Sequence, residues 1–190
     1  SVRGTVMRTT LRRSQIVRYV EMRYAHDQTE NSKIEAIRDL VASVRPHPDQ
    51  IIAAIDGNLT SIRKVNLPLK VAKKADELLP FELEALVPFE IEEAVIDHQP
   101  IETQNGMVTM LAGVAPKTRV SQTLEMFAQA GIQPRQLGVG AAALDALTNI
   151  CETIQSEAPQ LLLDIRVEGT DICILQGNSC RFARTLSVGS

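Results

Sequence analysis

Residues 138–143, Gly-Val-Gly-Ala-Ala-Ala, have the spacing that most directly suggests chemistry in this chain. They fit the pattern G-x-G-x-x-A where a strand is predicted to lead into a helix, and Asp164 follows roughly 20 residues later. In dinucleotide-binding folds such glycines let the backbone approach a pyrophosphate, and the acidic residue binds a ribose hydroxyl. However, the sequence after Asp164 predicts antiparallel hairpins instead of a second parallel unit. A dinucleotide-binding, Rossmann-like domain is therefore kept as a lesser alternative.

The histidines and serines give no catalytic pattern. His26, His47 and His98 are scattered, with no cysteine or carboxylate at the spacing of metal ligands, so no metal site is expected. The serines lack the strand-turn-helix context of a nucleophile elbow. No catalytic residue is predicted.

The three cysteines are an odd number at unrelated spacings, which fits a reducing compartment better than a disulfide framework. A two-residue turn at residues 177–178 would place Leu175 opposite Cys180 and Cys173 opposite Phe182. The two thiols would then not be cross-strand partners. We expect both to be buried as small apolar side chains.

The formal net charge of −3 conceals an uneven distribution of charge. Residues 1–23 hold six arginines and one acid, whereas residues 70–102 hold nine acids and three lysines. The basic segment could attract phosphate, anionic lipid headgroups or an acidic partner, although a solvated strand face explains it more simply. Nucleic acid is not expected as a partner, because the chain has no tryptophan and only 3% aromatic residues to stack on bases.

Periodicity predicts how the first half of the chain is arranged. Apolar residues at three- and four-residue steps (Ile34, Ile37, Val41 and Val44) predict a helix over residues 30–44. The turn signal at residues 56–58 predicts that strands 50–55 and 61–67 form a hairpin. Strands are also expected at residues 2–8 and 15–24, and a helix from residue 71, kinked at Pro80 and ending before Pro88.

The second half alternates hairpins and helices. Asn105-Gly106 predicts a tight turn between strands 94–102 and 107–115. A helix over residues 117–130 should direct Val120, Leu124 and Phe127 inward and stop at Gly131. The chain continues with a strand at 134–139 and then a helix, whose apolar stripe comprises Leu144, Leu147, Ile150, Cys151 and Ile154. It ends with strands at 160–165, 171–176 and 179–186. This mixture predicts an α/β or α+β fold with mixed sheets.

Residues 78–99 contain two Pro-Phe-Glu units eight residues apart, followed by the strand-like Ala-Val-Ile-Asp-His-Gln. Phe81, Leu86 and Phe89 are expected to form a local core. The order of these motifs, with Leu67-Pro68 before them and Gly113-Val114-Ala115 after them, resembles the PilM/GspL family. Those proteins are actin-like components of type IV pilus and type II secretion machines, related to the cell-division protein FtsA.

The resemblance implies an actin-like, ribonuclease H-like first domain with a small inserted ββ-helix subdomain. Residues 1–65 and 117–190 would form the sheet domain, and residues 66–116 the insertion. It also implies two phosphate-binding hairpins with an Asp followed closely by Gly. The first would lie before Ser1, and a second lobe would follow Gly189.

The second phosphate-binding hairpin would begin at Asp164, but Arg166 stands where the family pattern has Gly. A side chain there would hinder the close approach of backbone amides to phosphate. Asp164 is thus the one candidate cofactor-binding residue, in a degraded loop. ATP with Mg²⁺ is expected, if at all, in a longer form, and the chain itself is not expected to be an enzyme.

The resemblance implies a scaffold that binds other proteins at the cytoplasmic side of the inner membrane. Its partner would be a short cytoplasmic peptide of a PilN-like membrane-anchored protein or the secretion ATPase, with homo-oligomers also open. The peptide would be captured in a groove between the sheet domain and its insertion. Candidate contacts are Glu90 and Glu93 in the acidic run, and Arg12 in the basic segment. The acidic run comprises Glu82, Glu84, Glu90, Glu92 and Glu93. The alternative is an ATP-hydrolysing filament protein of the FtsA type.

No apolar run is long enough to cross a bilayer.

Overall fold

The computed structural model describes residues 1–10, 14–23, 29–45, 51–149, 151, 154, 158–177 and 179–189. The chain forms two compact units. The first comprises residues 1–53 and 121–138, and the second comprises residues 54–120 and 139–190. The predicted insertion, residues 66–116, lies within the second unit.

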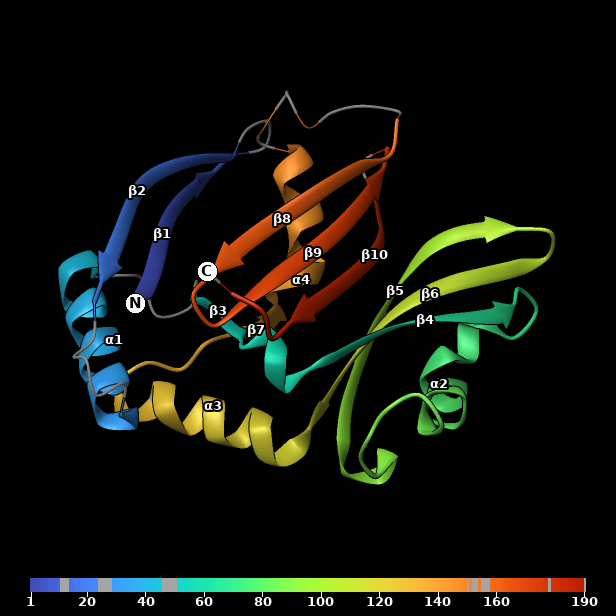
Figure 1. Cartoon of the computed structure of the whole chain (residues 1–190), viewed down its shortest axis with the longest axis horizontal. Coiled ribbons are helices and arrows are strands. Elements are labelled where there is room, and N and C mark those ends of the chain that lie inside the picture. Colours follow the sequence, from blue (N-terminus) through green and yellow to red (C-terminus); the bar gives the residue numbers. More distant parts are fainter. Residues whose placement is uncertain are drawn as a thin grey trace. The chain divides into compact units, whose positions relative to one another are not determined.

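In the first unit a helix packs on a strand pair (Figure 1). The strands β1 (Val2–Thr9) and β2 (Ser14–Met22) are antiparallel, with a bulge between Val6 and Met7. Helix α1 (Glu30–Val44) has the predicted bounds. Its N-cap is Thr29, whose side chain accepts a hydrogen bond from the Ser32 amide, and Arg45 ends it in the left-handed conformation.

The core of this unit joins α1 to the end of α3 (Lys117–Gln129). Ile34 and Ile37 of α1 pack with Ala130 and Ile132, and Gly131 ends the helix at a φ of +86°. The prediction that Leu124 faces inward is wrong, because its side chain is 40% exposed and Thr123 is buried instead. A helical period fixes which residues share a face, but not which face meets the core.

The second unit contains the sheet β4-β6-β5, covered on one face by α2 (Ala75–Glu84). Strand β6 (Met107–Pro116) is antiparallel to both β4 (Ser61–Pro68) and β5 (Ala94–Gln104). Asn105 and Gly106 join β5 to β6 with φ of 51° and 75°, which confirms the predicted turn. The core comprises Leu79 and Leu83 of α2 against Val65, Val108 and Val114 of the sheet, with five further buried residues.

The predicted hairpin of strands 50–55 and 61–67 is wrong. Strand β3 (Ile52–Ile55) pairs with β7 (Gln136–Val139), and β4 pairs with β6. Between β3 and β4, residues Gly57–Leu59 form the 3-10 helix η2, capped by the Asp56 side chain on the Asn58 amide. The turn residues are therefore used, but they redirect the chain into another sheet.

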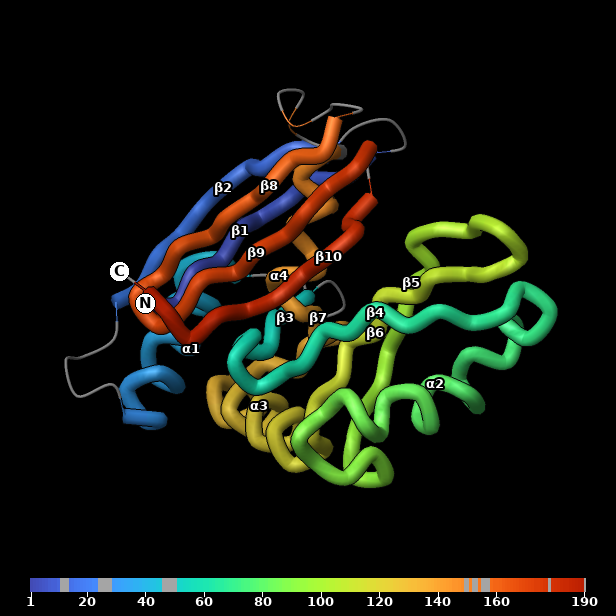
Figure 2. The backbone as a smooth tube through the Cα atoms, turned by 45° about the vertical axis from the view of Figure 1, so that its right-hand side comes forward, coloured from blue at the N-terminus to red at the C-terminus, as the bar shows by residue number. Residues whose placement is uncertain are grey.

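A second three-stranded sheet completes this unit. Strands β8 (Gln160–Arg166), β9 (Gly169–Gln176) and β10 (Ser179–Leu186) follow one another as antiparallel neighbours, traced in Figure 2. The helix predicted before them is correct only in part among the described residues. Helix α4 (Gly140–Ala143) has four residues and continues as the 3-10 helix η5 (Leu144–Asn149), and Ile150 lies outside the described residues.

The predicted pairing of the cysteines is half correct. Cys180 lies opposite Leu175 as expected, but a bulge at Arg181 then shifts the register, so that Cys173 lies opposite Ala183 and not Phe182. The two sulfur atoms are 3.4 Å apart and fully buried. Both thiols are free. They belong to a core with Ala141, Leu175 and Ala183.

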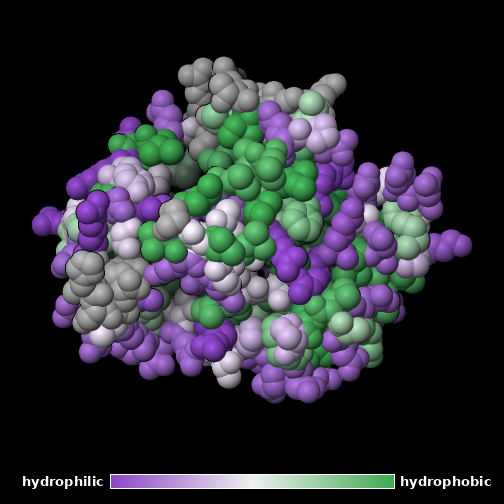
Figure 3. Space-filling model, viewed as in Figure 1, coloured by the Kyte–Doolittle hydropathy of each residue, from purple (hydrophilic) through white to green (hydrophobic). Residues whose placement is uncertain are grey.

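One face of β8 remains exposed. Leu161, Leu163 and Ile165 alternate along the strand, and each is at least 51% exposed. Figure 3 shows apolar side chains gathered over this sheet. Among the helices of the described residues, none is long and apolar enough to span a membrane.

Candidate functional site

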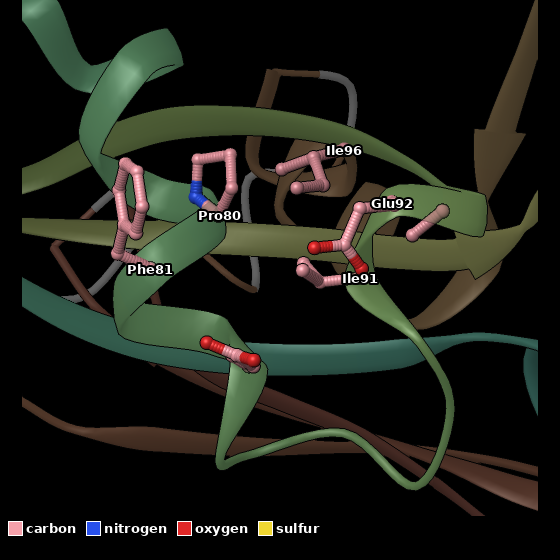
Figure 4. Close-up of a pocket in the computed structure, with 7 residues that line it drawn as sticks. Pro80, Phe81, Ile91, Glu92 and Ile96 are labelled. Atoms are coloured by element: carbon pink, nitrogen blue, oxygen red, sulfur yellow. The ribbon is translucent and has the colours of Figure 1, made fainter.

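A pocket lies in the second unit between α2, the 3-10 helix η4 (Ile91–Glu93) and the start of β5. Its volume is about 400 Å³. Figure 4 shows Pro80 and Phe81 on one side and Ile91, Glu92 and Ile96 on the other. Glu84 and Ala94 complete the lining. The walls are therefore mostly apolar, with carboxylates at two points.

The rotation of α2 about its axis determines which of its side chains line the pocket. Leu79 and Leu83 are fully buried against the sheet, which turns Pro80 and Glu84, one helical turn apart, toward the pocket. Proline at position 80 has no N–H to donate to the carbonyl of residue 76. The helix nevertheless continues to Glu84, because its buried leucines hold it to the sheet.

Two contacts fix the helix relative to the sheet. His98 Nε2 of β5 lies 3.0 Å from Asp76 Oδ1 in the first turn of α2. Beyond the last turn, Arg63 Nε of β4 donates to the carbonyl of Leu86 at 2.8 Å. These contacts tie the first turn of α2 to β5 and the segment just beyond α2 to β4.

The structure corrects the predicted local core of the insertion. Phe81 is 76% exposed and Leu86 is 44% exposed, so neither is a core residue. Phe89 is half-buried and packs against the core, as expected for the second Pro-Phe unit. The buried positions of α2 are instead Ala75, Leu79 and Leu83. The sequence-based prediction assumed that the few aromatic residues would be buried, and it therefore missed Leu79.

The acidic run borders the pocket. Glu84 and Glu92 line it, and Glu90 and Glu93, the predicted contacts, are exposed next to Ile91. The nearby cation Lys117 donates from Nζ to the backbone carbonyl of Glu92 at 2.6 Å. No carboxylate of these four glutamates forms an ion pair with a residue that the structure describes. The predicted contact Arg12 lies outside the described residues.

Asp164, the predicted cofactor-binding residue, belongs to an ion-pair network at the β8–β9 hairpin. Arg166 Nε lies 3.5 Å from Asp164 Oδ2, and Arg166 Nη2 lies 2.8 Å from Asp171 Oδ2. Thr185 Oγ1 donates to the other oxygen of Asp171 at 2.6 Å. The Asp171 side chain is 4% exposed, so it needs a cation beside it, and Arg166 supplies one. Arg166, which stands where the resemblance implies a glycine, is thus engaged in neutralising two carboxylates.

The glycine-rich stretch serves packing in this structure. A side chain at Gly140 would bring its Cβ within 3.0 Å of Asp171 Oδ2, and Ala141 is fully buried beneath the sheet. Strands β8, β9 and β10 are antiparallel, so the second parallel unit of a Rossmann-like domain is not formed by the described residues. The described residues also contain no group of three or more metal-ligating side chains.

Burial and hydrogen bonding alter the pKa values of the Cys173 thiol and of the Asp145 carboxyl. The hydrogen bond from Cys173 to Cys180, together with burial, raises the pKa of the Cys173 thiol well above its ordinary range. Burial raises the pKa of the Asp145 carboxyl, against backbone hydrogen bonds from Ala146 and Cys180 that lower it. A thiol that holds its proton this firmly is a poor nucleophile.

The chain is similar to known proteins in its three-dimensional structure, as two solved structures show. No family model and no curated protein matches the chain. A chain of the structure described as a PilM–PilN type IV pilus biogenesis complex matches at a TM-score of 0.81 and 20% identity, over 98% of this chain and 58% of that one. The cytoplasmic domain of EpsL, an inner-membrane component of the Vibrio cholerae type II secretion system, matches at 0.58 and 10% identity, over 95% of this chain and 64% of that one.

The chain therefore spans less than two thirds of the length of either solved structure. The likeness extends over both compact units, because it covers nearly every residue of this chain. The resemblance predicted from the sequence is thus confirmed for the fold. The chain has the mixed α/β fold of the PilM–PilN complex structure that it matches and of the EpsL cytoplasmic domain.

Proposed function

We propose that this chain belongs to a scaffold of a type IV pilus or type II secretion assembly platform, and that it acts by binding other proteins. The observation that carries the proposal is the match to PilM over 98% of the chain at a TM-score of 0.81. That structure is a complex with PilN, and EpsL is a component of a secretion system. A PilN-like cytoplasmic segment is the partner we propose. The scaffold would lie in the cytoplasm and reach the inner membrane through that partner.

The ion pairs at the β8–β9 hairpin favour binding over ATP hydrolysis. In the actin-like ATPases, close backbone approach to phosphate depends on glycine in this loop. Here Arg166 contacts Asp164 and Asp171 instead. An ATP-binding filament protein of the FtsA type remains the second candidate, favoured by the actin-like fold. Residues 66–116 remain our proposal for the inserted subdomain, and residues 1–65 with 117–190 for the sheet domain.

A binding experiment tests the scaffold proposal. The purified 190-residue chain would be titrated by calorimetry with the cytoplasmic segment of the PilN-like protein from the same genome. We expect saturable one-to-one binding, and a scrambled segment of the same composition should give no heat beyond dilution. Equal heats from the native and scrambled segments would contradict the proposal.

A second titration separates the two candidates. ATP with Mg²⁺ would be added to the chain and to Arg166→Gly, which restores the family's residue. The scaffold proposal expects no binding of ATP by the natural chain at millimolar concentration. Micromolar binding with slow turnover would instead favour the filament protein.

A further inference from the structure

We propose that the pocket between α2 and β5 is a docking site for a partner segment that inserts an apolar side chain and flanks it with lysine or arginine. The inference rests on the proposed scaffold function and names the place and chemistry of one contact. The pocket lies wholly within the second unit, on the α2 side of the β4-β6-β5 sheet. It differs from the groove between sheet domain and insertion that the sequence suggested.

The first argument is the exposure of Phe81. Its ring is 76% exposed on the rim, although the chain has only four phenylalanines. Exposure of a large apolar side chain to water does not stabilise the folded chain, but its burial under a partner would favour binding. Leu79, two residues earlier, is completely buried, so the helix could have offered the ring a core position. The fold instead leaves the ring beside an apolar hollow.

The second argument is the shape of the pocket. Its volume of about 400 Å³ lies within the ~300–1,000 Å³ usual for binding clefts. Ile91 forms a buried part of the wall, and Ala94 and Ile96 continue it along β5. These groups offer no hydrogen-bonding side chain to a ligand. An aliphatic or aromatic side chain is therefore the suitable occupant.

The third argument is the charge at the rim. Glu84 and Glu92 line the pocket, and Glu90 and Glu93 lie on the same short segment as Glu92. The Lys117 ammonium donates to the backbone carbonyl of Glu92 and not to a carboxylate of these residues. A surface with this excess of carboxylates attracts cations and repels phosphate. The complementary partner is a basic polypeptide segment, and anionic lipid and nucleic acid are disfavoured.

Fluorescence anisotropy of the full chain can test this directly. The probe would be a labelled peptide, Gly-Arg-Lys-Leu-Phe-Arg-Lys-Gly, with a second peptide that carries Glu at each basic position. Phe81→Ser removes the exposed ring, and the double variant Glu84→Gln/Glu92→Gln removes the rim charge. Leu69→Ser is the matched control, because Leu69 is 51% exposed in the same unit and does not line the pocket.

We expect the basic probe to bind, with affinity that falls as salt rises. Phe81→Ser should weaken it at least tenfold, the double variant should weaken it threefold or more at low salt, and Leu69→Ser should change it less than twofold. The acidic peptide should not bind. Equal affinity of the two peptides, no binding of the basic probe, or an unchanged affinity of Phe81→Ser would each overturn the inference.

The same variants separate this inference from the scaffold function. If the PilN-like segment binds Phe81→Ser and the natural chain equally, the pocket is not its docking site, although the scaffold proposal stands. If that segment binds neither protein while the basic probe does bind the pocket, the scaffold proposal fails by itself.

Discussion

Truncation of Leu79 should strongly destabilise the packing of α2 on the β4-β6-β5 sheet, whereas truncation of Phe81, two residues along the same helix, should barely affect it. The Leu79 side chain is 0% exposed and packs in the core with Leu83 and Val108. Leu79→Ala removes carbon atoms worth about 2 kcal/mol in transfer free energy, at ~0.8 kcal/mol for each buried methylene. The cavity that remains adds to this, so we expect a loss of about 3 kcal/mol.

Phe81→Ala should cost under about 0.5 kcal/mol, because three quarters of its surface is already in solvent. Urea unfolding followed by circular dichroism near 222 nm measures both variants, with hydrogen exchange of the β6 amides reporting on the β4-β6-β5 sheet itself. The assignment of the helix face is refuted if the order is reversed. A loss below about 1 kcal/mol for Leu79→Ala would also refute the tight packing described here.

Three further outcomes are expected. Arg166→Met should cost about 2 kcal/mol, below the ~3–5 kcal/mol of a fully buried pair because the Arg166 side chain is 32% exposed. Adding Asp171→Asn should restore at least half of the loss in urea unfolding. Burial raises the pKa of Asp145 above its ordinary 3.8, so the folded state binds its proton more tightly and the free energy of unfolding should fall as pH rises above about 4. Asp145→Asn should remove that decline in a series of urea melts from pH 3 to pH 7, and an unchanged slope would contradict it. Gly106→Ala should cost about 1 kcal/mol in thermal unfolding, because a φ of +75° strains any residue with a Cβ although open space surrounds it; a stabilised variant would refute this.

Local signals were sufficient for several elements. The bounds of α1 follow from its apolar period and from Thr29, whose side chain caps the first turn. The turn at Asn105 and Gly106 follows from residues that tolerate positive φ. In both cases the determining interactions join residues a few positions apart, so the sequence contains all the information needed.

Strand partners and helix faces required the tertiary structure. Residues 56–58 predict a change of chain direction, but β3 pairs with β7, some 80 residues later. Such distant pairing is possible because the entropic cost of closing a loop rises only slowly with loop length. The position of the sheet, not the helical period, decides that Leu79 is buried and Phe81 exposed.

The candidate site shows the same division. The sequence by itself identified the acidic run, the two Pro-Phe units and the departure at Arg166, because residue types and their order are local facts. Only the folded chain brought Phe81 and Glu84 opposite Ile91 and Ile96, and placed Arg166 between two carboxylates. A pocket and a buried ion pair consist of distances between side chains on different elements, and those distances are set when the elements pack together.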